Sequence, residues 1–299
     1  MKRDLLEEDV GSIKQLWGLP AASKILKKQS EGGFWRYPGK VKEEWNTQED
    51  YNQIETFRQL GYLIQKYGFN MNHNSIQKAA EFLFSNQTEE GDIRGIYSTQ
   101  HSPNYSGMIF ELLILAGYEK DPRIKKGLDW LLTVRQNDGG WAIAMRTLNM
   151  KWQDAFKHSE PLEPKRSKPH SHLITGAALR PFSIHPDYQK RIEIQQAGRL
   201  LFEQFFENDK YADKKDKSHW TKFTFPFWFN DLISALITLS NLNFARKEPK
   251  IQEALYWFIN EQNGDGSWNL KILRAGGDKE IKLWMALNIC RILKSFYSK

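Results

Sequence analysis

The amino-acid sequence predicts an all-α protein built from repeated pairs of helices. Two observations carry this prediction: a nine-residue apolar pattern with helical spacing recurs four times, and a turn that contains glutamine follows each copy. One aromatic stretch, residues 220–229, briefly alternates like a strand, but its Pro226 argues for an irregular or edge segment. Helices are therefore the expected elements along almost the whole chain.

The first helix of each pair is marked by four segments that align without gaps. They begin at Ile76, Ile124, Ile194 and Ile251, and each has apolar or small residues at offsets 0, 3, 4, 7 and 8, which form one face of an α-helix. The residue at offset 3 is alanine or glycine in every copy, which leaves room for a neighbouring helix. We therefore expect these helices to pack closely against similar ones.

A turn that ends the first helix follows each segment. The turns read "NQTEEGDI", "RQNDGGW", "EQFFENDKY" and "EQNGDGSW", and a degenerate copy, "KQSEGGFW", precedes them. Glycine ends a helix readily because it enters the left-handed backbone region without steric cost. Asp138 and Asp265 recur in these turns, so we interpret them as structural hydrogen-bond acceptors rather than acid catalysts.

The second helix of each pair is predicted from an apolar segment that follows the turn after a loop of variable length. These segments are "YNQIETFRQLGYLI", "YSGMIFELLILAGY", "SHLITGAALRPF", "FNDLISALITLSNL" and "EIKLWMALNICRIL". Such helix pairs either stack as an open solenoid or curl into a closed double ring. The chain ends on an apolar segment where a solenoid needs a polar cap, which favours the ring.

Composition indicates a globular chain of one domain, residues 1–299. Of the 299 residues, 40% are hydrophobic, which supports a sizeable core. A single cysteine, Cys290, excludes an internal disulfide framework and suits a reducing compartment, so a cytoplasmic protein is expected. No apolar run is long enough to predict a transmembrane segment.

The net charge of +7 is weak evidence for an anionic partner. Much of the excess positive charge lies in two loop segments, "KHSEPLEPKRSKP" and "DKYADKKDKSH". Acidic residues are interleaved there, so these segments are expected to be solvent-exposed loops rather than a binding surface. We therefore expect no nucleic-acid partner. Contact with a membrane surface stays open, and the oligomeric state is not predicted.

Two copies of the turn contain glutamine, aspartate, glycine and tryptophan in the same order. Residues 136–141 and 262–268 resemble the QW motif of the prenyltransferase and squalene oxidase repeat, found in squalene-hopene and oxidosqualene cyclases and in protein prenyltransferase β-subunits. The resemblance implies an α/α toroid of about five to six helix pairs, with second helices inside and first helices outside. It also implies that the glutamine and tryptophan tie neighbouring helix pairs together.

The motifs that carry chemistry in that superfamily are missing from this chain. Neither the DxDD motif of class II cyclases nor the magnesium-binding DDxxD motif occurs, because no two aspartates are adjacent. Protein prenyltransferases bind zinc through an aspartate, a cysteine and a histidine, but Cys290 lies in an apolar run with Asn288 two residues before it. We therefore predict no metal and no cofactor.

Candidate site residues are expected where loops lead into the inner helices, because these ends line one mouth of the cavity of a double ring. Asn104 and Tyr105 are candidate ligand-binding residues, although Asn104 or Ser106 is also suited to cap the helix. His170 and His172 are candidate catalytic residues that exchange protons at neutral pH; their spacing is a weaker match to a metal site.

The aromatic stretch around Pro226 is the densest group of candidates. Such a dense group of aromatic side chains could form a cavity wall that suits a polyprenyl chain or stacked sugar rings. Aromatic residues at this density are also typical of an ordinary core. Asp231 at its end is a candidate general acid or base and also stands where an N-cap residue belongs. Four residues are candidate ligand-binding residues: Trp220, Phe223, Phe227 and Trp228.

Three functions are compatible with the predicted fold and these candidate residues. The first is a terpenoid-cyclase-like or prenyltransferase-like protein with an aromatic cavity for an apolar or isoprenoid ligand. The second is a carbohydrate-active enzyme, a lyase or hydrolase, which requires two carboxylates about 5 to 10 Å apart in the cavity, such as Asp231 with Asp154 or Asp92. The third is a non-catalytic scaffold that engages a partner protein. Whether the chain is an enzyme stays open.

Overall fold

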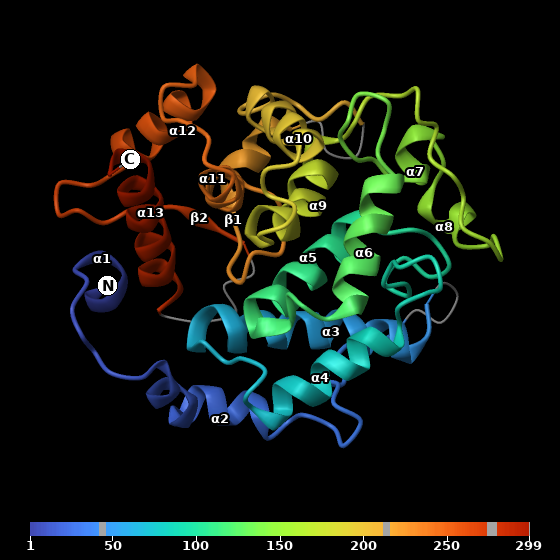
Figure 1. The fold of residues 1–299 in the computed structure, drawn as a ribbon, viewed down its shortest axis with the longest axis horizontal. Helices are drawn as coiled ribbons and strands as arrows, with labels where there is room; N and C mark the ends of the chain where they lie inside the picture. Colours follow the sequence, from blue (N-terminus) through green and yellow to red (C-terminus); the bar gives the residue numbers. More distant parts are fainter. Residues whose placement is uncertain (42–45, 212–215, 274–279, 299) are drawn as a thin grey trace.

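The fold is mostly helical, with one pair of short strands among the described residues (Figure 1). The strands β1 (Lys222–Phe223) and β2 (Lys271–Ile272) are parallel, and Lys222 pairs with Lys271. The helical content confirms the all-α prediction. The structure is a computed structural model that describes residues 1–41, 46–211, 216–273 and 280–298.

The outer helices contain the four predicted first helices. Each buries one face and exposes the other, as their apolar periodicity predicts. In Figure 1, α2, α4, α10 and α12 lie at the periphery. The outer helices are α2 (Pro20–Leu26), α4 (Asn74–Ser85), α6 (Pro122–Thr133), α10 (Ile192–Glu203) and α12 (Pro249–Asn260).

The inner helices correspond to the predicted second helices. Almost every residue of α5 and α9 is buried, and each inner helix contacts the next along the chain, with the most extensive contact between α5 and α9. Short π-helices continue α3 through Tyr62–Lys66 and α5 through Ile114–Tyr118. The inner helices are α3 (Gln48–Gly61), α5 (Pro103–Leu113), α9 (His172–Ile184), α11 (Leu232–Asn241) and α13 (Ile281–Tyr297).

Short helical segments complete the described part of the chain. Two of them precede the first outer helix, two follow the turn after α6, and one precedes β1. They are α1 (Lys2–Leu5), the 3₁₀ helix Ile13–Gly18, α7 (Ala144–Thr147), α8 (Trp152–Ala155) and the 3₁₀ helix Lys217–Thr221.

The small residues of the outer helices allow close packing against the inner layer. A Cβ atom added at Gly127 of α6 would lie 2.0 Å from Cζ of Phe110 on α5. Ala79, Ala197 and Ala254, at the equivalent positions of the other copies, are fully buried. The prediction of close helix approach is therefore confirmed at these positions.

The turn tryptophans fasten each turn to the helix that precedes it. In three copies the indole Nε1 donates a hydrogen bond to the carbonyl oxygen ten residues earlier in the chain. The donor–acceptor distances are 2.7 to 2.8 Å, and the indoles are buried. The pairs are Trp35 with Ile25, Trp141 with Leu131 and Trp268 with Phe258.

The turn glutamines join one helix pair to the next. Gln29 Nε2 donates to the carbonyl of Ser75 in the first turn of α4, and Gln87 Nε2 donates to the carbonyl of Arg123 in the first turn of α6, at 2.8 and 2.9 Å. Gln136 instead binds the carbonyls of residues 165 and 168, because a long inserted loop lies beside it. The expected tie between neighbouring pairs is thus present at the first two turns.

The two ends of the described chain meet beside α13, as Figure 1 shows. Arg291 of α13 forms an ion pair with Asp4 of α1, and Lys294 Nζ donates to the carbonyl of Leu5 at 2.9 Å. Lys66 is at the end of the α3 extension, and its Nζ lies 3.1 Å from Oε2 of Glu280, just before α13. Contacts therefore run from the last inner helix back to the first.

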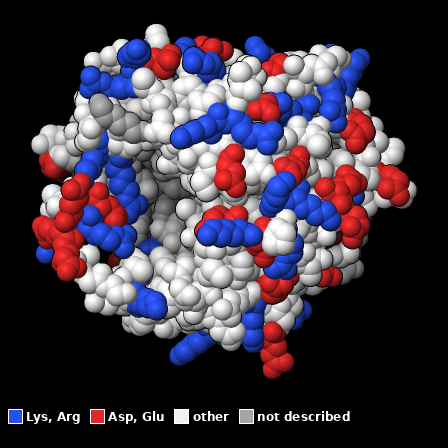
Figure 2. All heavy atoms as spheres, viewed as in Figure 1, with Lys and Arg blue, Asp and Glu red and all other residues white. Residues whose placement is uncertain are grey.

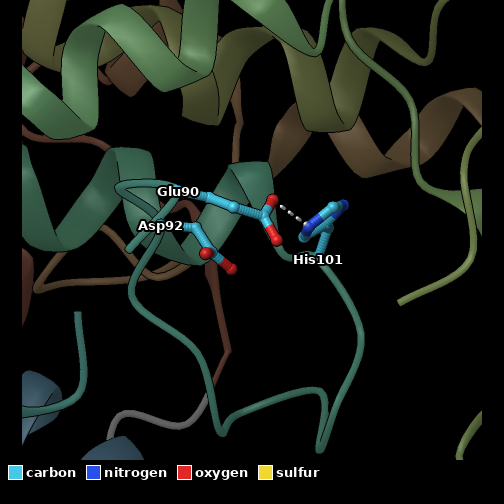
Figure 3. A group of neighbouring side chains, drawn as sticks. All are labelled: Glu90, Asp92 and His101. Atoms are coloured by element: carbon cyan, nitrogen blue, oxygen red, sulfur yellow. Dashed lines mark hydrogen bonds and ion pairs between the residues drawn. The ribbon is translucent and has the colours of Figure 1, made fainter. Parts of the chain in front are cut away.

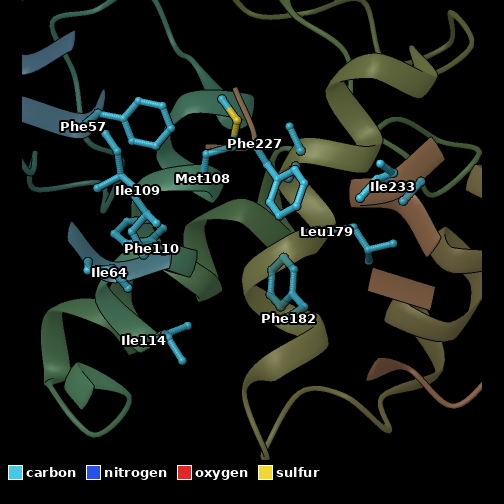
Figure 4. Close-up of a cluster of buried hydrophobic side chains, with 14 of the residues drawn as sticks. Phe57, Ile64, Met108, Ile109, Phe110, Ile114, Leu179, Phe182, Phe227 and Ile233 are labelled. Carbon is cyan, nitrogen blue, oxygen red and sulfur yellow. The ribbon is translucent and has the colours of Figure 1, made fainter. Parts of the chain in front are cut away.

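A cluster of buried apolar side chains fills the space between the inner helices and extends under the outer ones. Figure 4 shows part of it, with side chains from α5 and the π-helix that continues it (Phe110, Ile114), from α9 (Leu179, Phe182) and from the segment before α11 (Phe227). Within the described ranges, no helix has both the length and the apolar character needed to cross a lipid bilayer.

Candidate functional site

A cavity of about 440 Å³, the large chamber, lies between the inner helices. Most of its wall comes from the C-terminal halves of these helices and their extensions, and Phe225, Phe227 and Ser234 complete it at the N-terminal end of α11. Figure 2 shows a deep hollow in this face of the molecule. The apolar part of the wall consists of Ile64, Phe69, Leu115, Ile184, Phe225, Phe227, Ile237 and Ile292.

A smaller cavity of about 70 Å³, the small chamber, borders the large one. Phe57, Tyr62 and Trp228 contribute aromatic wall to it. The residues that line both chambers are Gln65, Arg180, Phe225 and Phe227.

Residues 225–227 form a partition between the two chambers. The backbone N–H of Phe227 donates to Gln65 Oε1 at 3.3 Å, and the carbonyl of Phe227 accepts from Arg180 Nη1 at 2.9 Å. The Phe225 ring stacks on Trp284 of α13, with centroids 5.7 Å apart and planes 7° apart. The partition is therefore anchored to three inner helices or their extensions.

A buried ion pair occupies the wall beside the partition. Arg180 Nη2 of α9 lies 2.5 Å from Glu111 Oε2 of α5, and Arg180 is 2% exposed. Arg180 also lies over the ring of Phe227, 5.9 Å from its centroid. Removing the charges of Arg180 and Glu111 from water costs free energy. Their mutual attraction offsets this desolvation cost because the two charged groups are in direct contact.

Asp231 is placed as a helix cap rather than on the cavity wall. It is fully buried at the N-terminus of α11, where its Oδ1 accepts from the backbone N–H of Ser234 at 2.9 Å and the Ser234 hydroxyl accepts in return from the backbone N–H of Asp231 at 3.0 Å. Burial raises the pKa of Asp231 to about 6, against the opposing effect of hydrogen bonds from Ser234 and Thr224. Its catalytic role stays a prediction.

His170 binds the turn aspartate of the third repeat. Its backbone N–H and its Nδ1 lie 2.8 and 3.0 Å from Asp138 Oδ2. Burial would raise the pKa of Asp138, but the hydrogen bonds from His170 and Gly140 hold it below its ordinary value. This places His170 in the structural turn, in agreement with the interpretation of Asp138 as a hydrogen-bond acceptor.

His172 lies in the core at the start of α9. Its ring stacks on Trp220, with centroids 4.7 Å apart, and its Nδ1 is 3.6 Å from the buried Asp209 Oδ2. Burial lowers the pKa of His172 to about 4, with Asp209 opposing the shift. His172 and His170 therefore have different partners, and a shared proton-exchange role is not favoured by these contacts.

Asn104 and Tyr105 lie beside an aromatic cluster near the small chamber. Asn104 Nδ2 donates to the Tyr97 hydroxyl at 3.0 Å, and the Tyr105 ring meets those of Phe57 and Trp228 edge to face. Only Trp228 and Phe57 of this group line the small chamber. Ser102, rather than Asn104 or Ser106, is the N-cap residue of α5.

The expected position of the cavity mouth differs from the observed cavity wall. The loop before α9 is closely packed, since Gly140 abuts the His170 side chain and His172 stacks on Trp220. Trp220 and Phe223 are fully buried core residues. Of the predicted ligand-binding residues, Phe227 and Trp228 line the chambers.

Glu90, Asp92 and His101 bring three possible metal-ligand atoms within 4.8 Å of one another. Figure 3 shows the Glu90 carboxylate directed at the His101 ring, at 2.9 Å. Arg94 donates to both oxygens of Asp92 at 3.0 Å and so already occupies this carboxylate. The contacts describe an ion-pair network in the second turn, and they do not favour a metal site.

The carboxylates expected of a carbohydrate-active enzyme, Asp231, Asp154 and Asp92, line neither the large nor the small chamber. Asp92 is bound by Arg94, and Asp154 lies on α8 beside Lys157. Among the described residues that line the large chamber, Glu111 supplies the carboxylate, and it faces Arg180. These contacts disfavour that alternative.

Glu111 and Arg180 are the site residues that sequence reasoning missed. Each is an isolated charge inside an apolar helical run, "MIFELLILAGY" and "TGAALRPF". A charge in such a run must be paired or face a cavity. An isolated charge inside an apolar run could therefore have identified each residue as a candidate. It could not have shown that Glu111 and Arg180 are each other's partners.

Comparisons with known proteins agree with this fold. The enfumafungin synthase efuA of Hormonema carpetanum is 21% identical over 224 residues, which cover 64% of this chain and 16% of that protein. The chain thus spans only a small part of this relative. No family model matches.

Among solved structures, the type II terpene cyclase MstE from Scytonema, as a variant in complex with its substrate geranylgeranyl dihydroxybenzoate, is similar to this chain. The TM-score is 0.56 at 13% identity, and the alignment covers 96% of this chain and 76% of that one. The chain therefore shares the α/α fold of this type II terpene cyclase.

Proposed function

We propose that the chain is a terpenoid-cyclase-like protein that binds an apolar or isoprenoid ligand in the large chamber. The observation that carries the proposal is the chamber itself, whose aliphatic and aromatic wall lies between the inner helices. Its volume of about 440 Å³ is in the range of small-molecule sites. The similarity to a terpene cyclase solved with a geranylgeranyl substrate supports the same ligand class.

The proposal concerns binding rather than a defined reaction. Protonation of an alkene needs an acid that faces the ligand, and the Glu111 side chain in the chamber wall is engaged by Arg180. Asp231 is an N-cap behind the wall, beside the wall residue Ser234. We also propose that the helix pairs form one closed toroidal domain, which the contacts between the two ends of the chain support.

The experiment tests this proposal by reducing the volume of the large chamber with a larger side chain. Ile237→Phe adds volume to the chamber wall, whereas Leu132→Phe makes the same kind of change on outer helix α6, away from the chamber. Native mass spectrometry after incubation with geranylgeraniol should show a bound ligand with the wild-type protein and with Leu132→Phe, and a marked loss with Ile237→Phe. Failure of the wild-type protein to bind geranylgeraniol, or equal binding by both variants, would refute the proposal.

A further inference from the structure

The Arg180–Glu111 pair is exceptional among the contacts of the cavity wall. Both residues border the large chamber, and both project from helices whose other residues are almost entirely buried. The charged residues of this wall, within the described ranges, are Glu111, Arg180 and Arg291. Arg291 is bound to Asp4 at the surface, so the ion pair beside the partition is the charged feature of the chamber's interior.

The guanidinium group of Arg180 is held in position by two partners. Nη1 donates to the Phe227 carbonyl at 2.9 Å, and Nη2 faces Glu111 Oε2 at 2.5 Å. A guanidinium group has five N–H donors in a fixed fork, so these contacts leave further donors beside the chamber. Arg180 borders both chambers, so its donors are adjacent to the space that a ligand would occupy.

The Glu111 carboxylate has acceptor capacity that the protein does not use. Arg180 is its ion-pair partner among the described residues, and no other side chain there is recorded as a donor to it. A carboxylate accepts about four hydrogen bonds. The Glu111 side chain is 12% exposed, and Glu111 lines the large chamber. A donor carried by a bound ligand would therefore find an acceptor in the wall.

A hydroxyl group matches this pair because it both donates and accepts. Its O–H would donate to Glu111 while its oxygen accepted from Arg180. A pure hydrocarbon would cover the same charges without replacing their lost hydration, which is unfavourable.

We propose that Arg180 and Glu111 form a recognition subsite for a hydroxyl group on an otherwise apolar ligand. This inference rests on the proposed function and narrows its ligand class to hydroxylated isoprenoids and similar apolar alcohols. A role limited to holding α5 against α9 would not produce such a preference.

The test is a competition between geranylgeraniol and the hydrocarbon of the same skeleton that lacks the hydroxyl. Equal amounts of the two are incubated with the protein, and the bound species are counted by native mass spectrometry. We expect the alcohol to be favoured by about tenfold or more, the usual effect of hydrogen bonds to charged groups. Binding of neither compound would refute the proposed function, whereas equal binding of both would refute the hydroxyl subsite alone.

The matched variant replaces both charges together, Arg180→Met with Glu111→Leu. Exchanging a buried ion pair for apolar residues of similar volume is often neutral or stabilising, so this variant should fold. It should bind the hydrocarbon at least as well as the wild type and lose the preference for the alcohol. The control, Arg94→Met with Asp92→Leu, removes an ion pair that lines neither chamber and should keep the preference.

Retention of the preference in the Arg180→Met, Glu111→Leu variant would overturn the inference. If that variant does not fold, Glu111→Gln is the second test, because the amide keeps the size of the side chain while removing its charge. It should reduce the preference for the alcohol, and an unchanged preference would equally count against the subsite. Thermal unfolding of each variant establishes that the protein compared is folded.

Discussion

The indole Nε1 of Trp141 lies 2.7 Å from the carbonyl oxygen of Leu131, and both residues are fully buried. The same bond, with the same separation of ten residues, recurs at Trp35 and Trp268. A recurrent bond of this kind closes the C-terminal end of an outer helix onto its own turn. It therefore contributes to the fold in these three repeats, away from any single reaction site.

Trp141→Phe should destabilise the protein. The change leaves the Leu131 carbonyl buried without this donor and opens a small cavity, which together cost about 2 to 4 kcal/mol. Urea denaturation gives the free energy of unfolding. Trp257→Phe, at a partly exposed position of α12, should cost clearly less. Equal losses in both variants would show that the indole bond is unimportant.

Gly127→Ala should also destabilise the protein, although alanine favours a helix. The new Cβ would lie 2.0 Å from Phe110 Cζ, and overpacking of this kind typically costs about 1 to 3 kcal/mol. The better helix propensity returns about 1 kcal/mol. Thermal and urea unfolding measure the net effect. Gly264→Ala, where a Cβ meets nothing within 4 Å, is the control and should be nearly neutral.

Asp231→Asn should change the pH dependence of stability. Burial raises the folded-state pKa of Asp231 from the ordinary value of 3.8 to about 6, so the folded protein holds this proton more tightly than the unfolded chain. The associated stability is present below the ordinary pKa and is lost as pH rises through about 6. Asparagine caps a helix without titrating. The variant should therefore gain stability relative to wild type between acidic and neutral pH, as urea titrations measure; a constant difference would contradict this.

His172→Gln tests a pH dependence of stability that is opposite to that of Asp231. Burial lowers the folded-state pKa of His172 from 6.5 to about 4, so the unfolded chain takes up a proton first. Stability is therefore lost as pH falls from the ordinary pKa towards about 4. Relative to wild type, the variant should be least stable at neutral pH and should recover as pH falls. Urea titrations at several pH values measure this, and a constant difference between the variant and the wild type across the range would contradict the prediction.

The helix pairs and their fasteners were predictable because they depend on local patterns. The spacing at Ile76 and Ile124 predicts one apolar face, and α4 and α6 have that face buried. The glycine-containing turns predict where helices end, and Gly139 and Gly266 adopt positive φ there. These features are decided by residues within one or two turns of each other.

The candidate site was predicted only in part. Phe227 and Trp228 line the chambers, but His170 and His172 lie in packed structure at the other ends of the inner helices. Aromatic and histidine residues have the same appearance in a sequence whether they line a cavity or fill a core. Which of these occurs depends on what packs opposite them.

The sequence by itself determined the helical periodicity, the turns that end the outer helices and hence the repeated pair of helices. The tertiary structure alone decided which ends of the inner helices enclose a cavity and that Glu111 and Arg180, 69 positions apart, form an ion pair in its wall. Periodicity is a property of neighbouring residues along one helix. A cavity and an ion pair between helices depend on the relative placement of distant segments, which local patterns do not encode.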